Sequence, residues 1–284
     1  MKIVQENLIY FNMISYIGGK SNIAKSLIIP NIPKNIETYC EVFSGMYWTF
    51  FKINIQEFPN LKNVIYNDIN ILNVNLFNCV KNHEMFYQEI SKIPSQNKEL
   101  FDEFQREIFD PYFEIDLSQP DFHSAIAYSY ILTQNWSGTN PSTSKFIDLK
   151  GKYKSKFDTF KDKLQNINWQ KHFDRIDLIE NLDFEEIIEK HDSENSFFYC
   201  DPPYMNCEKY YANHEFNPQS HERLAKTLQN IKGKFALSYY YFPQLEEWFP
   251  KNKYHWEQKD FAKAASAKIG VKQNKGTELL IMNY

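Results

Sequence analysis

Short apolar runs followed by turn residues recur along the chain and predict buried strands. The clearest are Thr38 to Phe43, Asn63 to Tyr66 and Ser196 to Cys200, which are rich in β-branched and aromatic residues. The first two precede Met46 to Ile55 and Ile71 to Val80, which we expect to be helices. Strand, turn and helix in repeated order predict an α/β fold with a parallel sheet.

The C-terminal part continues this pattern. Asn217-Pro218 opens a predicted helix that reaches about Ile231, with the asparagine as N-cap and the proline in the first turn. Two further strands are predicted after it, Phe235 to Tyr241 and Thr277 to Met282.

The middle of the chain has a different pattern. Gln96 to Phe113 and Asp121 to Thr133 have helical character, whereas the basic segment Ser137 to Lys156 reads as a loop or a hairpin. We therefore expect a core formed by residues 1–81 and 182–284, and an inserted, mainly helical domain formed by residues 82–181.

Composition restricts the class of protein. A chain of 284 residues with 43% hydrophobic content can bury a sizeable core. No window approaches the roughly 18 apolar residues of a membrane span, and the first 13 residues lack the apolar run of a secretory signal. The four cysteines are isolated, which indicates neither disulfides nor zinc. We expect a soluble, cytoplasmic protein with no metal and no membrane partner.

Charge points to nucleic acid only locally. The formal net charge is -4, but Lys145 to Lys163 holds seven lysines against three aspartates, an excess of four. Lys263 to Lys275 holds four lysines and no acidic residue. Each stretch is typical of a solvated face or of a surface that contacts phosphate.

Asp201-Pro202-Pro203-Tyr204 carries the strongest chemical signal. It follows a strand directly, at the edge where parallel sheets bind ligands. Two prolines fix φ and lack N–H groups, so the carbonyls between them are rigid acceptors. Asp201 and such a carbonyl can accept both hydrogens of a base amino group, and Tyr204 offers a ring to an extruded base. The plain alternative is a turn that merely ends the strand.

Three further motifs precede this tetrapeptide, and one follows it. They are Tyr16-Ile17-Gly18-Gly19-Lys20, Glu41-Val42-Phe43-Ser44-Gly45, Asn67-Asp68-Ile69-Asn70 and Glu278-Leu279-Leu280. In composition and in order along the chain, the set resembles the Dam-type family of DNA adenine methyltransferases.

The resemblance implies a Rossmann-like S-adenosylmethionine-dependent methyltransferase sheet with an inserted target-recognition domain. The implied cofactor is S-adenosylmethionine and the implied substrate is double-stranded DNA. A cognate restriction endonuclease is an expected partner, and a monomer is expected, with a weak dimer as the alternative. The implied catalytic residues are Asp201, Pro202, Pro203 and Tyr204. The implied cofactor-binding residues are Tyr16, Gly18, Gly19, Lys20, Glu41, Phe43, Ser44, Gly45, Asp68 and Asp201.

Several of these roles have a physical reason. Lys20 could pair with the methionine carboxylate, Asp68 could accept from ribose hydroxyls, and Phe43 could stack on the cofactor's adenine. Alone, a Gly-Gly-Lys segment or a turn aspartate is usually an ordinary turn. Their joint occurrence favours the cofactor site.

One position departs from the family pattern. Tyr47 stands where the family commonly has a second glycine, which lets the backbone approach the cofactor without a Cβ. Tyr47 could line a reshaped pocket, point away, or weaken cofactor binding. We expect activity to be retained, because Asp201, Tyr204, Lys20 and Asp68 all stand.

The segment Tyr130 to Gly138 loosely resembles the stretch that enters the family's target-reading hairpin. Our candidates for DNA contact are Asn135, Trp136, Asn140 and Lys145. Amides can pair with adenine edges, and an aromatic ring can fill the gap that a flipped base leaves. For Trp136, packing in a core is an equal alternative.

Two other functions stay open at this point. The first is an enzyme of the same fold that methylates RNA or a protein glutamine; the order of the motifs disfavours it. The second is a non-catalytic DNA-binding homologue that has lost cofactor affinity through Tyr47.

Overall fold

The computed structural model describes residues 13–14, 19–20, 23–135, 140–151, 153–208, 216–262 and 275–284. Within these ranges the centre is a seven-stranded sheet with the order β3-β2-β1-β4-β5-β7-β6. The strands are β1 (Thr38–Glu41), β2 (Asn63–Asn67), β3 (Leu178–Glu180), β4 (Ser196–Cys200), β5 (Lys234–Tyr239), β6 (His255–Ala262) and β7 (Lys275–Met282). The predicted strands are confirmed to within two residues, while β3 and β6 were not predicted.

The direction of the sheet positions the site. Strands β1 to β5 are parallel to one another, whereas β7 runs antiparallel between β5 and β6. Strand β1 pairs with β2 on one side and with β4 on the other, so the strand order reverses there. In open α/β sheets, ligands bind beyond the carboxyl ends of the strands at such a reversal. The residues that follow β1 and β4 therefore lie where a ligand is expected.

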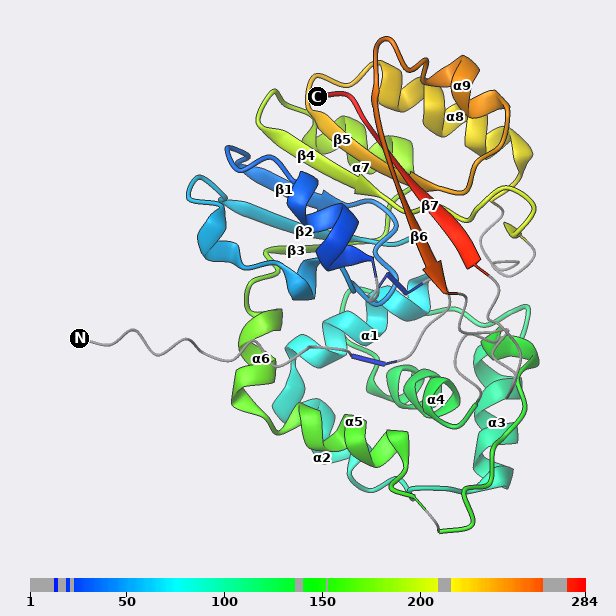
Figure 1. Cartoon of the computed structure of the whole chain (residues 1–284). Helices are drawn as coiled ribbons and strands as arrows, with labels where there is room; N and C mark the ends of the chain where they lie inside the picture. The colour runs from blue at the N-terminus through cyan, green and yellow to red at the C-terminus, as the bar shows by residue number, and fades with distance from the viewer. Residues whose placement is uncertain are drawn as a thin grey trace.

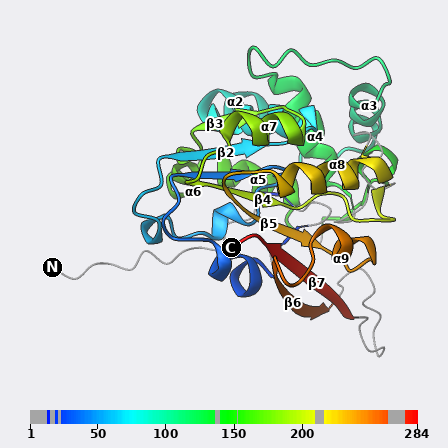
Figure 2. The same cartoon turned by 90° about the horizontal axis from the view of Figure 1, so that it is seen from above.

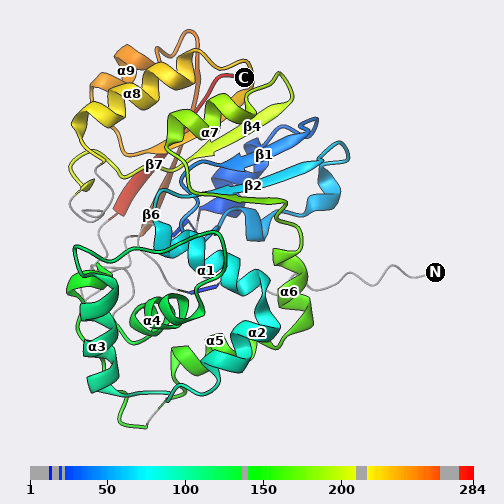
Figure 3. The same ribbon diagram turned by 180° about the vertical axis from the view of Figure 1, so that it is seen from behind.

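Alternate residues of each strand enter opposite cores, as a period of two requires. Tyr39 and Phe197 pack into one core, while Cys40 and Phe198 pack into the other. Three helices cover the second face, as Figures 2 and 3 show: α7 (Phe184–His191), α8 (Pro218–Gln229) and α9 (Gln244–Trp248).

Among the described residues, six helices follow β2 in the sequence and precede β3, and they form the lower part of Figure 1. They are α1 (Ile71–Lys81), α2 (His83–Ile90), α3 (Lys98–Ile108), α4 (Phe122–Thr133), α5 (Lys156–Leu164) and α6 (Ile167–Phe173). Their buried side chains, such as Phe77 and Phe160, belong to the same hydrophobic core as Tyr39 and Tyr66 of the sheet. This helical region is therefore continuous with the core of the sheet.

The predicted helix from Met46 to Ile55 is wrong. The segment forms turns and two short 3-10 helices, η3 (Phe50–Lys52) and η4 (Ile55–Glu57). Tyr47 has φ of 55°, in the left-handed region, which a right-handed helix cannot contain. The amide of Phe50 donates to the Glu41 carboxylate at 2.8 Å, so a side chain takes the place of a helical carbonyl.

The other helix predictions hold. The predicted helices that begin near residues 71, 96, 121 and 217 are confirmed as α1, α3, α4 and α8, although α3 ends at Ile108, before the predicted end at Phe113. In the described part of Ser137 to Lys156, the chain is a loop with one 3-10 turn, η5 (Pro141–Thr143), before α5 begins at Lys156. A π-helix, η1 (Ala24–Ile28), and a 3-10 turn, η2 (Ile29–Asn31), precede β1. Over the described ranges, no helix has the length and apolar character needed to cross a membrane.

Candidate functional site

The turns after β1 and β2 are bonded to each other. The amide of Gly45 donates to Oδ2 of Asp68 at 2.7 Å, and the Tyr66 hydroxyl donates to the Gly45 carbonyl at 2.8 Å. Ser44 adds a third link, because its hydroxyl accepts from the Asn67 amide at 3.1 Å. Gly45 has φ of 51°, a conformation that glycine adopts without strain. This edge of the site is therefore a rigid double turn.

Asp68 also fixes the start of α1. Its Oδ1 accepts from the Asn70 amide at 2.8 Å, and the Asn70 side chain in turn accepts from the Leu72 amide as the N-cap of α1. The predicted cofactor ligand Asp68 thus holds backbone groups here, and its contact with a ribose stays a prediction.

Glu41 lies in the same region and is almost fully buried, at 3% exposure. Its Oε1 accepts from the Tyr39 hydroxyl at 2.7 Å and from the Phe50 amide at 2.8 Å. Burial raises the pKa of Glu41 to about 8, although both hydrogen bonds favour the charged form. Glu41 therefore fixes the turn after β1.

Tyr47 points away from this edge and into the core. Its side chain is fully buried, its ring stacks on Phe50 at 4.8 Å, and its hydroxyl donates to the Ile65 carbonyl at 3.0 Å. Of the three outcomes considered for Tyr47, the structure shows that its side chain points away from the expected cofactor cleft. The left-handed φ of Tyr47 retains the backbone geometry that a glycine would adopt without strain.

Four side chains meet at the end of β4. Lys20 Nζ lies 2.7 Å from Asp201 Oδ1 and 3.8 Å from Glu278 Oε1. The Tyr204 hydroxyl lies 3.1 Å from Asp201 Oδ1 and also donates to Glu278 Oε1. We call Lys20, Asp201, Tyr204 and Glu278 the acidic cluster. It joins segments that are more than 250 residues apart in the chain.

Burial and charge oppose each other in the acidic cluster. Burial raises the pKa of Asp201 above its ordinary value, although the charge of Lys20 acts against it. Burial likewise raises the pKa of Glu278 to about 7. Burial disfavours the Lys20 cation, yet the charges of Asp201 and Glu278 outweigh this effect and raise the pKa of Lys20. Lys20 therefore stays charged between two carboxylates that hold protons unusually well.

The ring of Tyr204 is covered in this structure. Only 8% of Tyr204 is exposed, Lys20 Nζ lies 4.8 Å from the ring centroid, and Tyr240 packs edge-on at 4.5 Å. Lys20 thus occupies the place that was predicted for a base amino group, beside Asp201 and over Tyr204. A base that stacks on Tyr204 must displace it.

A pocket of about 280 Å³ opens beside the turn after β1. Its lining residues are Val42, Phe43, Ile69, Leu182, Asp183, Phe184, Phe216, Asn217, Ser220 and Arg223. The Phe43 ring lies 5.8 Å from the rings of both Phe184 and Phe216, so the wall is aromatic. Volumes of about 300 Å³ are at the lower end for ligand pockets. The pocket suits one ring system of a ligand.

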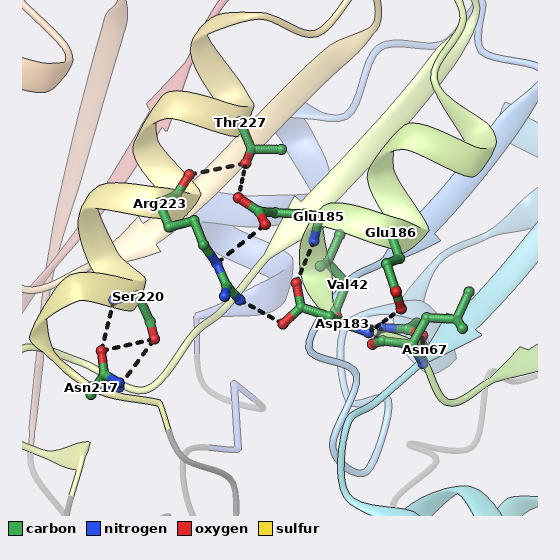
Figure 4. A network of polar contacts seen from close by, with 10 residues as sticks. Val42, Asn67, Asp183, Glu185, Glu186, Asn217, Ser220, Arg223 and Thr227 are labelled. Carbon is green, nitrogen blue, oxygen red and sulfur yellow. Dashed lines mark hydrogen bonds and ion pairs between the residues drawn. The ribbon is translucent and has the colours of Figure 1, made fainter.

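A polar network borders this pocket (Figure 4). Arg223 of α8 pairs with Asp183 at 2.6 Å and with Glu185 at 3.4 Å, which ties α8 to the start of α7. Asn217 caps α8 by accepting from the Ser220 amide at 3.1 Å. These links hold together the pocket-lining residues Asp183, Asn217, Ser220 and Arg223.

Sequence reasoning missed this wall. Leu182, Asp183 and Phe184 were not among the candidate residues, although a signal was present. Asp183 and Glu186 have the spacing of a capping box, which the structure contains at the start of α7. Glu278 was recognised only as part of a motif, and its contact with Tyr204 could not be foreseen from a position 74 residues away.

The candidates for DNA contact lie in different surroundings. Asn135 is buried at 3% exposure and donates to Ser144 at 3.1 Å, while Asn140 accepts from the Ser142 amide at 3.0 Å. Lys145 is exposed. Trp136 lies outside the described residues, as do Tyr16 and Gly18, whereas Gly19 is described and packs against Trp48.

The first basic stretch is partly neutralised within the protein. Lys154 pairs with Asp162, and Lys161 pairs with Asp158 at 2.9 Å. Lys163 donates to the Met13 carbonyl at 3.2 Å. Most of the second basic stretch, residues 263–274, lies outside the described residues. Exposed lysines such as Lys145 are therefore the better candidates for phosphate contact.

Comparison with known families agrees with this arrangement. Residues 16–262 match the family described as D12 class N6 adenine-specific DNA methyltransferase. The chain belongs to this family. The match includes the Lys20 segment, both turns and Asp201 to Tyr204, and the reaction that names the family is methylation of adenine N6 in DNA.

Two curated relatives support the assignment of this methyltransferase. The type II methyltransferase M.MjaIII of Methanocaldococcus jannaschii is 28% identical over 95% of the chain and 98% of the relative. The type II methyltransferase M.FokI of Planomicrobium okeanokoites is 23% identical over 95% of the chain. The chain spans only 42% of the length of M.FokI.

Proposed function

We propose that this methyltransferase transfers a methyl group from S-adenosylmethionine to the N6 amino group of an adenine rotated out of double-stranded DNA. The observation that carries the proposal is the position of Asp201. It follows β4 at the reversal of the strand order and lies beside Lys20 and Tyr204 in a buried cluster. A partly buried carboxylate paired with a movable cation can accept hydrogen bonds from an amino group that replaces the cation.

The cofactor is assigned to the cleft that begins at the pocket beside Phe43. The aromatic wall suits an adenine ring, and Asp183 and Asn217 line the same pocket and supply polar groups for its ring nitrogens. Asp68, next to the lining residue Ile69, is assigned to the ribose. When bound, S-adenosylmethionine supplies an electrophilic methyl group on a cationic sulfur. Phe43, Ser44 and Gly45 lie on the rigid double turn, which holds this wall in place before the ligand arrives.

On the base side, the chain must release Lys20. Asp201 and the carbonyl of Pro202 or Pro203 accept the two amino hydrogens, which draws the lone pair of nitrogen out of conjugation with the ring. Tyr204 stacks on the base from the side where Lys20 lies in the free protein. Glu278, 3.8 Å from Lys20, offers the displaced ammonium group a second carboxylate.

The helical region and the loop after α4 are assigned to DNA recognition. Lys145 is exposed on this loop, and the loop is anchored at its base, because the Ile147 amide donates to the Gln134 carbonyl at 2.8 Å. We also assign Asn135, Trp136 and Asn140 to DNA contact. The proposed protein partner is a cognate restriction endonuclease, and the proposed state of the enzyme is a monomer.

The test is to express the protein in a host without DNA methylation and to map modified bases by single-molecule sequencing. We expect N6-methyladenine in one sequence context with the wild type and none with Asp201→Ala. Cofactor binding by calorimetry without any DNA modification would contradict the proposal, and would favour an RNA or protein substrate. Absence of cofactor binding would favour a non-catalytic homologue.

A further inference from the structure

Glu278 is a buried carboxylate that the proposed reaction leaves without a chemical task beyond its attraction for Lys20. It lies on β7, is 2% exposed, and accepts from the Tyr204 hydroxyl. Burial of a carboxylate is unfavourable unless polar partners compensate for it. Its position at the floor of the acidic cluster therefore calls for an explanation.

The Tyr204 hydroxyl lies between two carboxylates. It is within hydrogen-bond distance of Asp201 Oδ1, at 3.1 Å, and of Glu278 Oε1. A hydroxyl has one donor and two acceptor sites, so it can accept a proton on one side while it gives its own on the other. Asp201, Tyr204 and Glu278 thus form a continuous path for one proton.

The reaction produces such a proton. The lone pair of adenine N6 forms the new bond to the methyl carbon, and the bond from that carbon to sulfur breaks with its electron pair left on sulfur. The nitrogen then carries a positive charge and two hydrogens, and it must lose one hydrogen as a proton to become a neutral methylamino group.

We infer that Glu278 is the final acceptor of this proton, which reaches it through Asp201 and the Tyr204 hydroxyl. The electron pair of one N–H bond returns to nitrogen as the proton binds Asp201. Asp201 then passes a proton to the Tyr204 oxygen, while the original Tyr204 proton moves to Glu278. Asp201 ends as a carboxylate and Glu278 as a neutral acid. The inference rests on the proposed role of Asp201.

The surroundings of Glu278 suit this role. Lys20, Asp201 and Tyr204 face it, as do Tyr199 of β4 and Tyr240, and Lys259 lies opposite it on β6. Burial raises the pKa of Glu278 to about 7, whereas Lys20 favours its charged form. Glu278 is therefore ionised often enough at neutral pH to accept a proton, and it holds the proton better than an exposed carboxylate does.

The first test is the pH dependence of a single turnover on DNA that carries the mapped recognition sequence. We expect the wild-type rate to rise with pH through about 7, because the acceptor must be ionised. Glu278→Gln keeps an acceptor for the Tyr204 hydroxyl but cannot take the proton. We expect it to lose this limb of the profile and to slow transfer by roughly 10²-fold.

A second variant interrupts the path at its centre. Tyr204→Phe keeps the ring but removes the hydroxyl, so we expect a similar slowing, with little further loss in the double variant because both changes break one path. Glu246→Gln on α9 is the matched control, because Glu246 is an exposed carboxylate paired with Lys251 outside the cluster. It should keep the wild-type rate and profile.

A third measurement does not depend on turnover. Infrared titration of the free protein should show two protonated carboxyls in the wild type and in Glu246→Gln, one that ionises near pH 8 from Glu41 and one near pH 7 from Glu278. Only the one near pH 7 should be absent in Glu278→Gln, and Glu41→Gln identifies the other. A wild-type rate and pH profile in a folded Glu278→Gln protein would overturn the inference; if that variant does not fold, the same result in Tyr204→Phe does so. Transfer by Asp201→Ala would instead refute the proposed site itself.

Discussion

The carboxylates of Glu41 and Asp68, at the ends of β1 and β2, differ from the two in the acidic cluster in what holds them. Glu41 and Asp68 accept from backbone amides at 2.7 to 2.8 Å, which cannot leave without breaking the turn, and Glu41 also accepts from the buried Tyr39 hydroxyl at 2.7 Å. Asp201 and Glu278 are held by the long side chain of Lys20 and by a hydroxyl. The first pair therefore builds a fixed wall, and the second pair can exchange its partners for a substrate. Glu41 and Asp68 thus shape the site, whereas Asp201 and Glu278 can take part in the reaction.

The largest expected effect is on methyl transfer and comes from a change at Asp201, which can exchange its partners. Asp201→Ala should slow methyl transfer by about 10³-fold or more, because it removes the acceptor for the base amino group. Glu278 remains as a counter-charge for Lys20, so the free energy of unfolding should fall by no more than about 2 kcal/mol. Single-turnover rates and urea unfolding measure the two quantities. A large loss of stability with retained transfer would invert the comparison.

Tyr47→Gly tests whether the Tyr47 side chain stabilises the core behind the turn or contacts the cofactor. Removal of a buried aromatic side chain costs about 3 kcal/mol or more in the free energy of unfolding. Affinity for S-adenosylmethionine should stay within about threefold, because the ring faces the core. Tyr47→Phe is the control and should cost about 1 kcal/mol through its lost hydrogen bond to Ile65. Calorimetric titration that finds a large loss of affinity would place Tyr47 in the cofactor cleft instead.

Glu41 should make the free energy of unfolding depend on pH. Its pKa is about 8 in the folded protein against an ordinary 4.5, so the folded state keeps a proton that the unfolded chain has lost. The free energy of unfolding should therefore fall as the pH rises between these values, by at most about 1.4 kcal/mol per unit. Glu41→Gln should make this slope shallower, as measured by urea unfolding from pH 5 to 8. An identical slope in both proteins would show that Glu41 ionises normally.

The smallest expected effect compares a lysine that is available for DNA with one that is already held by a carboxylate. Lys145→Ala should weaken DNA binding several-fold and lower the salt dependence by about one phosphate contact. Lys154→Ala is the control, because Lys154 is already paired with Asp162. Its effect on the slope of affinity against salt should be smaller. Equal slopes for both variants and the wild type would remove Lys145 from the DNA surface.

The sheet and the tetrapeptide after β4 could be predicted because their signals are local. An apolar run such as Ser196 to Cys200 is buried on both faces, and the proline pair marks its end. The edge strand β6 escaped prediction because its sequence, His255 to Ala262, alternates poorly and bears many exposed polar side chains. β3 has only three residues, which is too short for a pattern.

The contacts within the site could be predicted less well, because they depend on long-range pairing. Phe50 was expected inside a helix, but its amide binds Glu41 nine residues earlier. The pocket wall at Asp183 arises from the pairing of α7 with α8 through Arg223. Neither contact follows from the periodicity of its own segment. Sequence reasoning therefore found the chemistry-bearing groups but not which of them hold one another.

Strand β7 lies between β5 and β6 and carries Glu278 into the acidic cluster. It follows every other described strand in the chain, so the ribosome makes Glu278 after the other three residues of the acidic cluster. A product that stopped before residue 275 would leave β6 without its neighbour in the sheet and Tyr204 without its second carboxylate. Translation of this strand is thus the step after which the folded chain can first assemble the complete cluster.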